Sequence, residues 1–441
     1  MTRSGDNLER LLFLGAVGVV FWAPLPFGSV EPWAVGILRI AAFGLVILWA
    51  VRSALTGALN VSTSPLQLVL YAAVALAFLQ TLPILSDGAR ISVDPFSTRQ
   101  TALTLLAFAL LFSLLLSVLD RRSRIVGVAW ALFVFAAALS LFGIVQQLSG
   151  TRDIYWFRPS PVETLFGPFV NKNHFAGLME LLLPMGIGFL VTGAVARDRK
   201  FLVLFAAVVI GLAVALSRSR GGAAALVAAI VFLVVMALAT SRRAQRSRSV
   251  SFAVARAVGA VALVGAIGLG VVWLGSDAVV DSFASLPADA AAVDATSRRG
   301  IWNATLALAA DHPVTGAGLG AYGTAIVAYW PSSEYATLLQ AHNDHLQVVA
   351  DAGIAGAVLG ILFAVGLGFY FVKGIHHKDP AMRAVALGAG AGIFGLLIHG
   401  LVDFNMQIPS NALMFLLSSA LVVRVATTTA GAVTLPEEIV K

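Results

Sequence analysis

The stretch "QAHNDHLQ" (residues 340–347) runs directly into "VVADAGIAGAVLGILFAVGLGFYFV" (348–372). Asp351 is the only charged residue of the second stretch, which is longer than the roughly 20 apolar residues that a helix needs to span a bilayer. The first stretch places two histidines, an aspartate and an asparagine at the mouth of this predicted helix. Polar groups gathered at a membrane boundary are costly to order, so they indicate a role at that place.

The composition of the whole chain is that of an integral membrane protein. Of 441 residues, 59% are hydrophobic and 12% are charged, and the mean hydropathy is +0.91, which no soluble domain of this size needs. The absence of cysteine excludes a disulfide framework and a thiolate site. The first apolar run, 11–23, follows basic residues as a signal peptide does. It lacks a clear small-residue cleavage site and another apolar run follows at once, so we expect a retained helix.

The apolar runs predict an all-α polytopic membrane protein with about twelve transmembrane helices. The predicted helices are 11–24, 33–51, 66–85, 101–119, 125–148, 174–195, 200–216, 221–239, 254–274, 348–372, 382–402 and 409–426. A large loop, 275–341, separates the ninth helix from the tenth. The chain then divides into six N-terminal helices (1–199), a core with the large loop (200–368), and C-terminal helices with a tail (369–441).

Loop charge predicts the orientation. With both termini in the cytoplasm, the inner segments hold 19 of the 29 lysines and arginines and the outer segments hold 9. The large loop is then periplasmic. The net charge of +7 reflects anchoring at the inner leaflet, not nucleic-acid binding.

In this orientation every unusual polar cluster falls on the outer face, which suggests a site that opens there. The alternative is that loops are polar and some must lie outside. The clusters are "NKNH" (171–174, with Asn173 and His174), "SRSRGG" (217–222), "RRGIW" (298–302), "HNDH" (342–345) and "DFNMQ" (403–407).

Two of these clusters carry paired arginines. "SRSRGG" joins two apolar runs with almost no loop, so Arg218 and Arg220 lie near headgroup depth, where guanidinium groups bind phosphate oxygens. The start of the next helix also favours an anion; the alternative is a turn with interfacial arginines. Arg298 and Arg299 precede a short helix with Ile301, Trp302, Leu306 and Leu308 on its apolar side, which we expect on the membrane surface. The glycines after it (316–323) are a weak nucleotide-binding pattern and are typical of a loop.

The "HNDH" cluster admits three interpretations. Asn343 or Asp344 caps the following helix, and His342 and His345, three residues apart, share a face at the start of the helix. A zinc site needs more ligands and a different spacing. A structural pair of histidines is one alternative, and His342 as a base is the other, because neutral imidazole accepts a proton near pH 7. In "LIHGLVDFNMQ", His399 and Asp403 lie about a turn apart, and a hydrogen bond between them would be structural.

The order "SRSRGG", "RRGIW…HPVTGAGLGAYG", "HNDHLQ…GIAG" resembles the O-antigen ligase and Wzy-type polymerase superfamily, with its core over about 200–368. "FGPFVNKNHFAGLMELLLP" and "LVDFNMQIPSNAL" are similar to its members as well. The resemblance implies a glycosyltransferase of the bacterial inner membrane that takes a glycan from undecaprenyl pyrophosphate on the periplasmic face. It implies no cofactor. The acceptor would be lipid A–core for a ligase, another lipid-linked repeat for a polymerase, or a protein.

The resemblance also assigns residues. The family's first arginine matches Arg220, its loop arginine matches Arg299, and its histidine matches His342. His345 departs from the family's pattern, so either histidine remains a candidate base. Arg218, Arg298, Asn343, His345, Asn173 and His174 are expected to bind substrate.

The chemistry of these residue types agrees with that assignment. Two arginines stabilise charge on a pyrophosphate leaving group without a metal ion, and a histidine deprotonates the acceptor hydroxyl. Attack opposite the leaving group inverts the anomeric carbon.

Three other classes fit less well. A transporter or flippase would bind near the membrane midplane between repeats, whereas these clusters lie at one face. A purely structural scaffold leaves the order of Arg220, Arg299 and His342 unexplained. An intramembrane protease would need an HExxH motif or a serine–histidine pair. The sugar, the linkage, the oligomeric state and the choice between ligase, polymerase and protein glycosyltransferase stay open.

Overall fold

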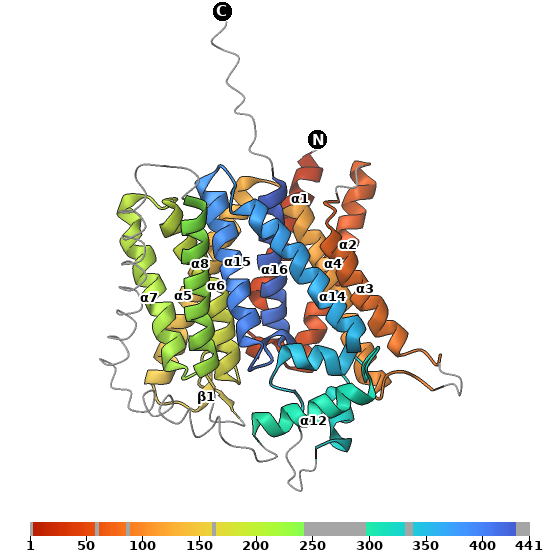
Figure 1. The fold of residues 1–441 in the computed structure, drawn as a ribbon. Coiled ribbons are helices and arrows are strands. Elements are labelled where there is room, and N and C mark those ends of the chain that lie inside the picture. The colour runs from red at the N-terminus through yellow and green to blue at the C-terminus, as the bar shows by residue number, and fades with distance from the viewer. Residues whose placement is uncertain are drawn as a thin grey trace, which may run out of the picture.

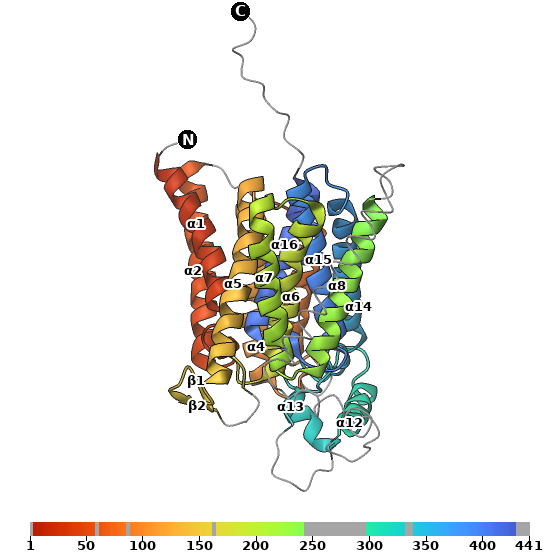
Figure 2. The ribbon, with the colours of Figure 1, turned by 90° about the vertical axis from the view of Figure 1, so that its left-hand side faces the viewer.

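The computed structural model describes residues 3–57, 61–84, 89–160, 165–241, 297–330 and 338–428. They form a bundle of long helices that run between an upper and a lower end (Figure 1). Both ends of the described chain lie at the upper end, and a smaller helical segment is attached at the lower end (Figures 1 and 2).

The helix bounds follow the apolar runs of the sequence. The bundle helices are α1 (Arg3–Trp22), α2 (Pro32–Thr56), α3 (Pro65–Gln80), α4 (Pro95–Val118), α5 (Arg122–Leu148), α6 (Lys172–Thr192), α7 (Lys200–Leu216), α8 (Arg220–Ser241), α14 (Asp344–Gly374), α15 (Pro380–His399) and α16 (Pro409–Thr427). The lower segment holds α12 (Arg298–Asp311), α13 (Tyr322–Ala325) and η3 (Ile326–Ala328). The short turns are η1 (Phe27–Ser29), η2 (Arg197–Arg199) and η4 (Asn405–Gln407), and β1 (Asp153–Ile154) pairs with β2 (Arg158–Pro159).

The predicted class, an all-α polytopic membrane protein, is confirmed. Among the described residues, 9 helices are long and apolar enough to cross a membrane. The shorter α3 has 16 residues, and α1 begins with charged residues. Each predicted helix coincides with one of these elements except 254–274, which lies outside the described residues. The described chain leaves the bundle at the upper end after α8 and resumes at the lower end with α12 (Figure 1).

Small residues let α6 and α15 pack closely at the centre of the bundle. A Cβ atom at Gly392 would lie 2.0 Å from the carbonyl oxygen of Leu181, and one at Gly388 would lie 2.6 Å from the Cα of Met185. Such close backbone approach is the usual way in which apolar helices associate in a membrane. This close packing fixes the relative position of α6 and α15, and with it the position of the polar groups at their lower ends.

A break in α14 attaches the lower segment to the bundle. Gly353 has φ 61° and ψ −157°, which separates the main-chain groups that an unbroken helix would pair. The carbonyls of Ala350 and Asp351 accept hydrogen bonds from Ala317 and Gly318, while the N–H groups of residues 354 and 355 donate to the carbonyls of residues 313 and 314. Residues 313–318 thus satisfy the groups that the break exposes.

The glycines of this segment therefore serve close packing, in agreement with the prediction of a loop. Gly316 has φ 71°, and a Cβ there would lie 2.2 Å from the nitrogen of Ala352. Gln80, at the end of α3, completes the joint: its amide nitrogen donates to the carbonyls of Thr315 and Asp351, and its oxygen accepts from Leu319.

The apolar side of α12 corrects one expectation. Ile301 and Leu308 are buried, and Leu308 belongs to a small core that also contains Tyr322 and Ala350. They therefore pack on the protein instead of the membrane surface. Only Leu306, of the predicted apolar side, is largely exposed, at 55%. The spacing of apolar residues along a helix indicates that one face is buried, but it does not indicate whether protein or lipid covers that face.

We predict that Gly353→Ala weakens the attachment of the lower segment. The backbone conformation at this position is accessible essentially to glycine alone, and a Cβ would lie 2.5 Å from the carbonyl of Val314. Thermal melting in detergent and limited proteolysis within 297–330 measure the effect. Gly360→Ala, in the same helix with open space around it, is the matched control and should melt at or slightly above the wild type. Equal melting of the two variants would contradict this account of the joint.

Candidate functional site

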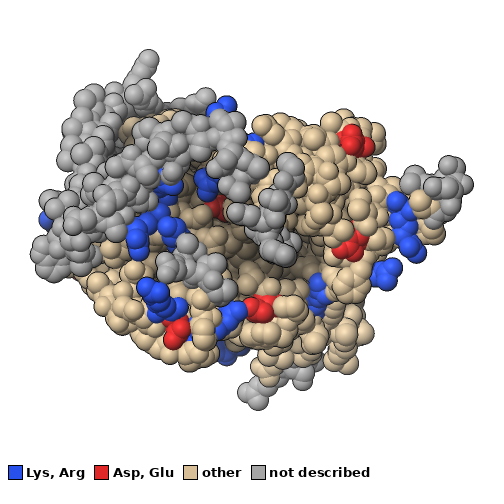
Figure 3. All heavy atoms as spheres, turned by 90° about the horizontal axis from the view of Figure 1, so that it is seen from below, with Lys and Arg blue, Asp and Glu red and all other residues tan. Residues whose placement is uncertain are grey.

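Four segments meet at the lower end of the bundle: the start of α6, the turn from α7 to α8, the region where α12 meets the start of α14, and the turn from α15 to α16. All five polar clusters of the sequence lie in these segments. Seen from below, lysine and arginine side chains gather around a hollow in this face (Figure 3). The predicted gathering of these clusters on one face is therefore present in the structure.

His342 projects from the chain just before α14. Its φ of 50° is unusual for a residue with a side chain, and its neighbours hold it in place. The N–H of Ala341 donates to Oε1 of Gln347, and the carbonyl of Ala341 accepts a hydrogen bond from Nε1 of Trp302. Asn343 is the N-cap of α14 and accepts from the N–H of Leu346. The helix cap, Gln347 and α12 together define the position of His342.

Phe404 separates His342 from a second histidine. The rings of His342 and Phe404 meet edge to face with centroids 4.8 Å apart, and the ring of His174 contacts the same phenyl ring at 4.7 Å. Nδ1 of His342 is buried and has no hydrogen-bond partner among the described residues.

The surroundings of His342 favour its neutral form. Burial lowers the pKa of His342 below its usual range, the nearby carboxylate of Asp403 partly opposes that shift, and the positive charge of Arg298 adds to it. A neutral imidazole at physiological pH can accept a proton.

A buried polar network lies behind the histidine. The side-chain amide of Asn173 donates to Asp403, whose main-chain carbonyl accepts from the N–H of Asp344. Asp344 in turn accepts from the N–H of Met406 at 3.0 Å, and Oδ1 of Asp344 has no described partner. Asp403 also lies 3.8 Å from Nε2 of His174. These contacts join the starts of α6 and α14 to the turn between α15 and α16.

The start of α8 presents cationic groups to the same end. The turn requires φ 56° at Arg218, and the hydroxyl of Ser219 caps α8 by accepting from the N–H of Gly222. Arg218 and Arg220 are both partly exposed and within electrostatic range of Lys172 at the start of α6. Three cationic side chains around a helix N-terminus favour an anion.

A buried pair beneath α8 corrects the expected partner of His399. Nδ1 of His399 lies 3.0 Å from Oε1 of Glu180, and both side chains are almost fully buried. His399 therefore pairs with Glu180 across α6 and α15 instead of with Asp403. Gly221 and Gly222 lie against the imidazole: a Cβ at Gly221 would be 2.9 Å from it. The pair thus packs directly against the turn that carries Arg220.

The arginines of α12 are exposed at its first turn. Ser297 caps the helix by accepting from the N–H of Gly300, and Trp302 joins it to Ala341 beside the candidate histidine. Arg298 is the one that acts electrostatically on His342. Among the described contacts none joins Arg299 to His342, although both flank the joint made by Trp302.

The second histidine of the motif, His345, lies on a different side of the helix start. Its ring is exposed, and its Nε2 donates to the carbonyl of Leu397 at 2.9 Å. A carbonyl only accepts, so this nitrogen carries a proton. Within the described ranges, no group of three or more His, Asp or Glu side chains could hold a metal ion.

Sequence reasoning missed Glu180 and Phe404, considered Asp344 only as a helix cap, and treated Asp403 as structural. Glu180 had a signal: it is the only acidic residue in the 21-residue apolar helix α6, and an ionisable group within a membrane span usually has a partner. The role of Phe404 as the wall between two histidines depends on segments far apart in the chain, and no local pattern indicates it.

We predict that His399→Ala strongly lowers the thermal stability of the protein in detergent. It leaves the buried carboxyl of Glu180 without its partner, and breaking one side of a buried pair costs about 3–5 kcal/mol. His376→Ala is the control, because this exposed histidine bonds only the carbonyl of Val372 among the described residues. If both variants melt at the same temperature, the Glu180–His399 pair does not stabilise the packing of α6 and α15.

A comparison with protein families adds an independent observation to this geometry. Residues 205–361 match the family model described as O-antigen ligase, whereas no curated protein matches the chain. The matched segment contains the turn before α8, all of α12, and the start of α14 with His342. Residues 205–361 are therefore similar to the O-antigen ligase family.

Proposed function

We propose that this protein is a membrane glycosyltransferase that moves a glycan from undecaprenyl pyrophosphate to an acceptor hydroxyl. The observation that carries the proposal is the meeting, at one end of the bundle, of His342 with the arginine-bearing starts of α8 and α12. All three elements lie within the O-antigen ligase match, and that family implies lipid-linked glycan substrates in general.

The arginines bind the leaving group. A lipid pyrophosphate gains negative charge on its bridging oxygen as the glycosidic bond breaks, and preorganised cations stabilise that charge. Arg220 and Arg299 contact the pyrophosphate directly, while Arg218 and Arg298 add to the positive potential around it. Guanidinium groups suit this task because they bind phosphate oxygens through paired hydrogen bonds.

His342 is the general base. Nε2 takes the proton of the acceptor hydroxyl as the oxygen forms its bond to the anomeric carbon, and the bond from that carbon to the pyrophosphate breaks on the opposite face. The anomeric carbon is therefore inverted, and no metal ion takes part. We assign the base to His342 instead of His345, because the exposed ring of His345 is held toward the carbonyl of Leu397, whereas the ring of His342 packs on Phe404 and is influenced by Arg298.

Some residues expected to bind substrate instead support the base. The side-chain oxygen of Asn343 is occupied by the helix cap, Asn173 donates to Asp403, and His174 packs on Phe404. We assign these three residues to positioning His342 and its wall, with the arginines as the substrate contacts.

The site faces the periplasm from the inner membrane of a bacterium. Two observations support this orientation: the charge split of the sequence, with 19 of 29 lysines and arginines in the predicted inner segments, and the position of both ends of the described chain opposite the site (Figure 1). An activated lipid donor suits that compartment, because the energy of the transfer is carried by the lipid pyrophosphate itself.

The acceptor decides between ligase and polymerase. The purified full chain is given one lipid-linked repeat unit without any other acceptor, and the products are separated on a gel. A ladder of lengthening glycans identifies a polymerase. Transfer only after addition of lipid A–core identifies a ligase, and transfer only to an added protein identifies a protein glycosyltransferase. No transfer to any of the three acceptors contradicts the proposal for the donor tested.

We predict that His342→Ala and Arg299→Ala each nearly abolish glycan transfer. Loss of a general base costs about 10²–10⁴-fold, and loss of one group that stabilises the leaving charge costs about 10²–10³-fold. Transfer to the accepted substrate is measured with purified protein. Size-exclusion chromatography and thermal melting establish that each variant is folded.

His345→Ala is the matched control and should retain most activity. A folded, active His342→Ala variant beside an inactive His345→Ala variant would reassign the base. Normal transfer by both His342→Ala and Arg299→Ala would refute the mechanism.

We also predict that Arg298→Gln moves the acidic limb of the kcat/KM profile to higher pH. The reaction needs neutral His342, so activity falls as pH drops through the pKa of that residue. The charge of Arg298 lowers this pKa, and its removal therefore raises the pKa and starts the loss of activity at a higher pH. Arg99→Gln, another exposed arginine at the lower end, should leave the limb in place. A shift in the opposite direction would exclude His342 as the titrating group.

A further inference from the structure

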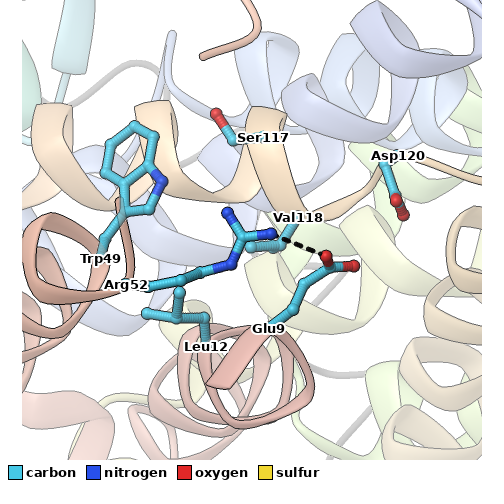
Figure 4. Close-up of a pocket in the computed structure, with 7 residues that line it drawn as sticks. All are labelled: Glu9, Leu12, Trp49, Arg52, Ser117, Val118 and Asp120. Atoms are coloured by element: carbon cyan, nitrogen blue, oxygen red, sulfur yellow. Dashed lines mark hydrogen bonds and ion pairs between the residues drawn. The ribbon is translucent and has the colours of Figure 1, made fainter. Parts of the chain in front are cut away.

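We propose that a cavity at the upper end of the bundle binds a lipid head group that carries both a phosphate and a primary ammonium. The cavity lies between α1, α2 and α4, at the end opposite the candidate active site. It has a volume of about 150 Å³, and its polar lining consists of Glu9, Trp49, Arg52, Ser117 and Asp120 (Figure 4). One water needs about 10–15 Å³ on the same measure, so the cavity has room for a head group.

Arg52 supplies the phosphate-binding group. Its side chain is only 4% exposed, and Nη2 bonds Glu9 at 2.9 Å. A guanidinium has five N–H donors, yet Nε is buried without a partner among the described residues. Figure 4 shows the guanidinium at the centre of the lining residues, between Trp49 and Glu9. A buried cation with donors to spare favours an anionic group beside it.

One carboxylate of the cavity leaves room for a cation beside the anion. Glu9 already binds Arg52, Arg121 and Arg124, which neutralises it. Asp120 pairs with Arg121 and Arg124 but remains 42% exposed, so one of its sides is open to a cation. A head group with a phosphate for Arg52 and an ammonium for Asp120 matches both charges, whereas a phosphate alone leaves the open side of Asp120 without a cation.

The position of the cavity indicates a lipid as the source of this head group. The cavity lies near the end of the spanning helix α2, at the depth where tryptophan and arginine side chains meet the head groups of a bilayer. In addition, α2 lies at the edge of the bundle (Figure 2), and only 17% of its apolar 18-residue stretch is buried. Exposed apolar residues such as Val51 and Leu55 give acyl chains a surface next to the opening.

Binding at this place would join three helices at the membrane boundary. Glu9 is on α1, Arg52 on α2, and Ser117 on α4, with Asp120 just after it. A head group that contacts all three elements stabilises their association, and the stabilisation grows with the logarithm of its concentration once the site is mostly occupied. The role is independent of glycan transfer at the other end of the bundle.

The test is native mass spectrometry of the purified full chain with phosphatidylethanolamine, phosphatidylcholine and phosphatidylglycerol of identical acyl chains. Phosphatidylcholine lacks ammonium N–H donors, and phosphatidylglycerol lacks the cation. We expect phosphatidylethanolamine to bind at least about tenfold more tightly than either, the worth of one charge-assisted hydrogen bond. Arg52→Gln and Asp120→Asn should each remove the preference. Because Asp120 is half-exposed, we expect Asp120→Asn to fold, so it still tests the proposal if Arg52→Gln does not fold.

Arg122→Gln is the control, because this exposed arginine at the same end pairs with Asp379 and does not line the cavity. It should keep the preference. Competition then separates a head group from a free anion: phosphoethanolamine should displace the lipid, and inorganic phosphate should not. Equal binding of the three lipids, a preference that survives in both cavity variants, or equal displacement by inorganic phosphate would overturn the proposal.

Discussion

The break of α14 at Gly353 is the constraint on which the lower face depends. An apolar helix with a break must satisfy the main-chain groups that it exposes, and residues 313–318 do so with four hydrogen bonds. This joint holds α12 against the bundle, and Trp302 of α12 in turn holds the carbonyl next to His342. A change of one backbone conformation thus positions two arginines and one histidine on a single surface.

The lower face also depends on hydrogen bonds between polar side chains that are buried in the apolar bundle. Glu180 and His399 pair beneath the turn of α8, while Asn173, Asp403 and Asp344 connect the ends of α6, α14 and α15. Buried polar groups without partners are expensive, so a network of this extent constrains the helix ends to one arrangement. Several of its buried atoms have no partner among the described residues.

The sequence predicted the fold class well because long apolar runs are an unambiguous signal. It also predicted that Arg220, Arg299 and His342 gather on one face, since loop charge and helix order determine which ends lie together. It did not predict that His399 pairs with Glu180, or that Phe404 separates His342 from His174, because both depend on how distant helices pack. The side of α12 that holds Ile301 and Leu308 was assigned to the membrane surface, since its periodicity is the same whether protein or lipid covers it.

The central claim is that a pyrophosphate binds between the starts of α8 and α12, beside His342. The most direct measurement is an electron cryomicroscopy structure of the full chain with undecaprenyl pyrophosphate. The account predicts pyrophosphate density within hydrogen-bond distance of Arg220 and Arg299 at the lower end of the bundle. Density for the pyrophosphate near the membrane midplane, or at the upper end, would contradict it.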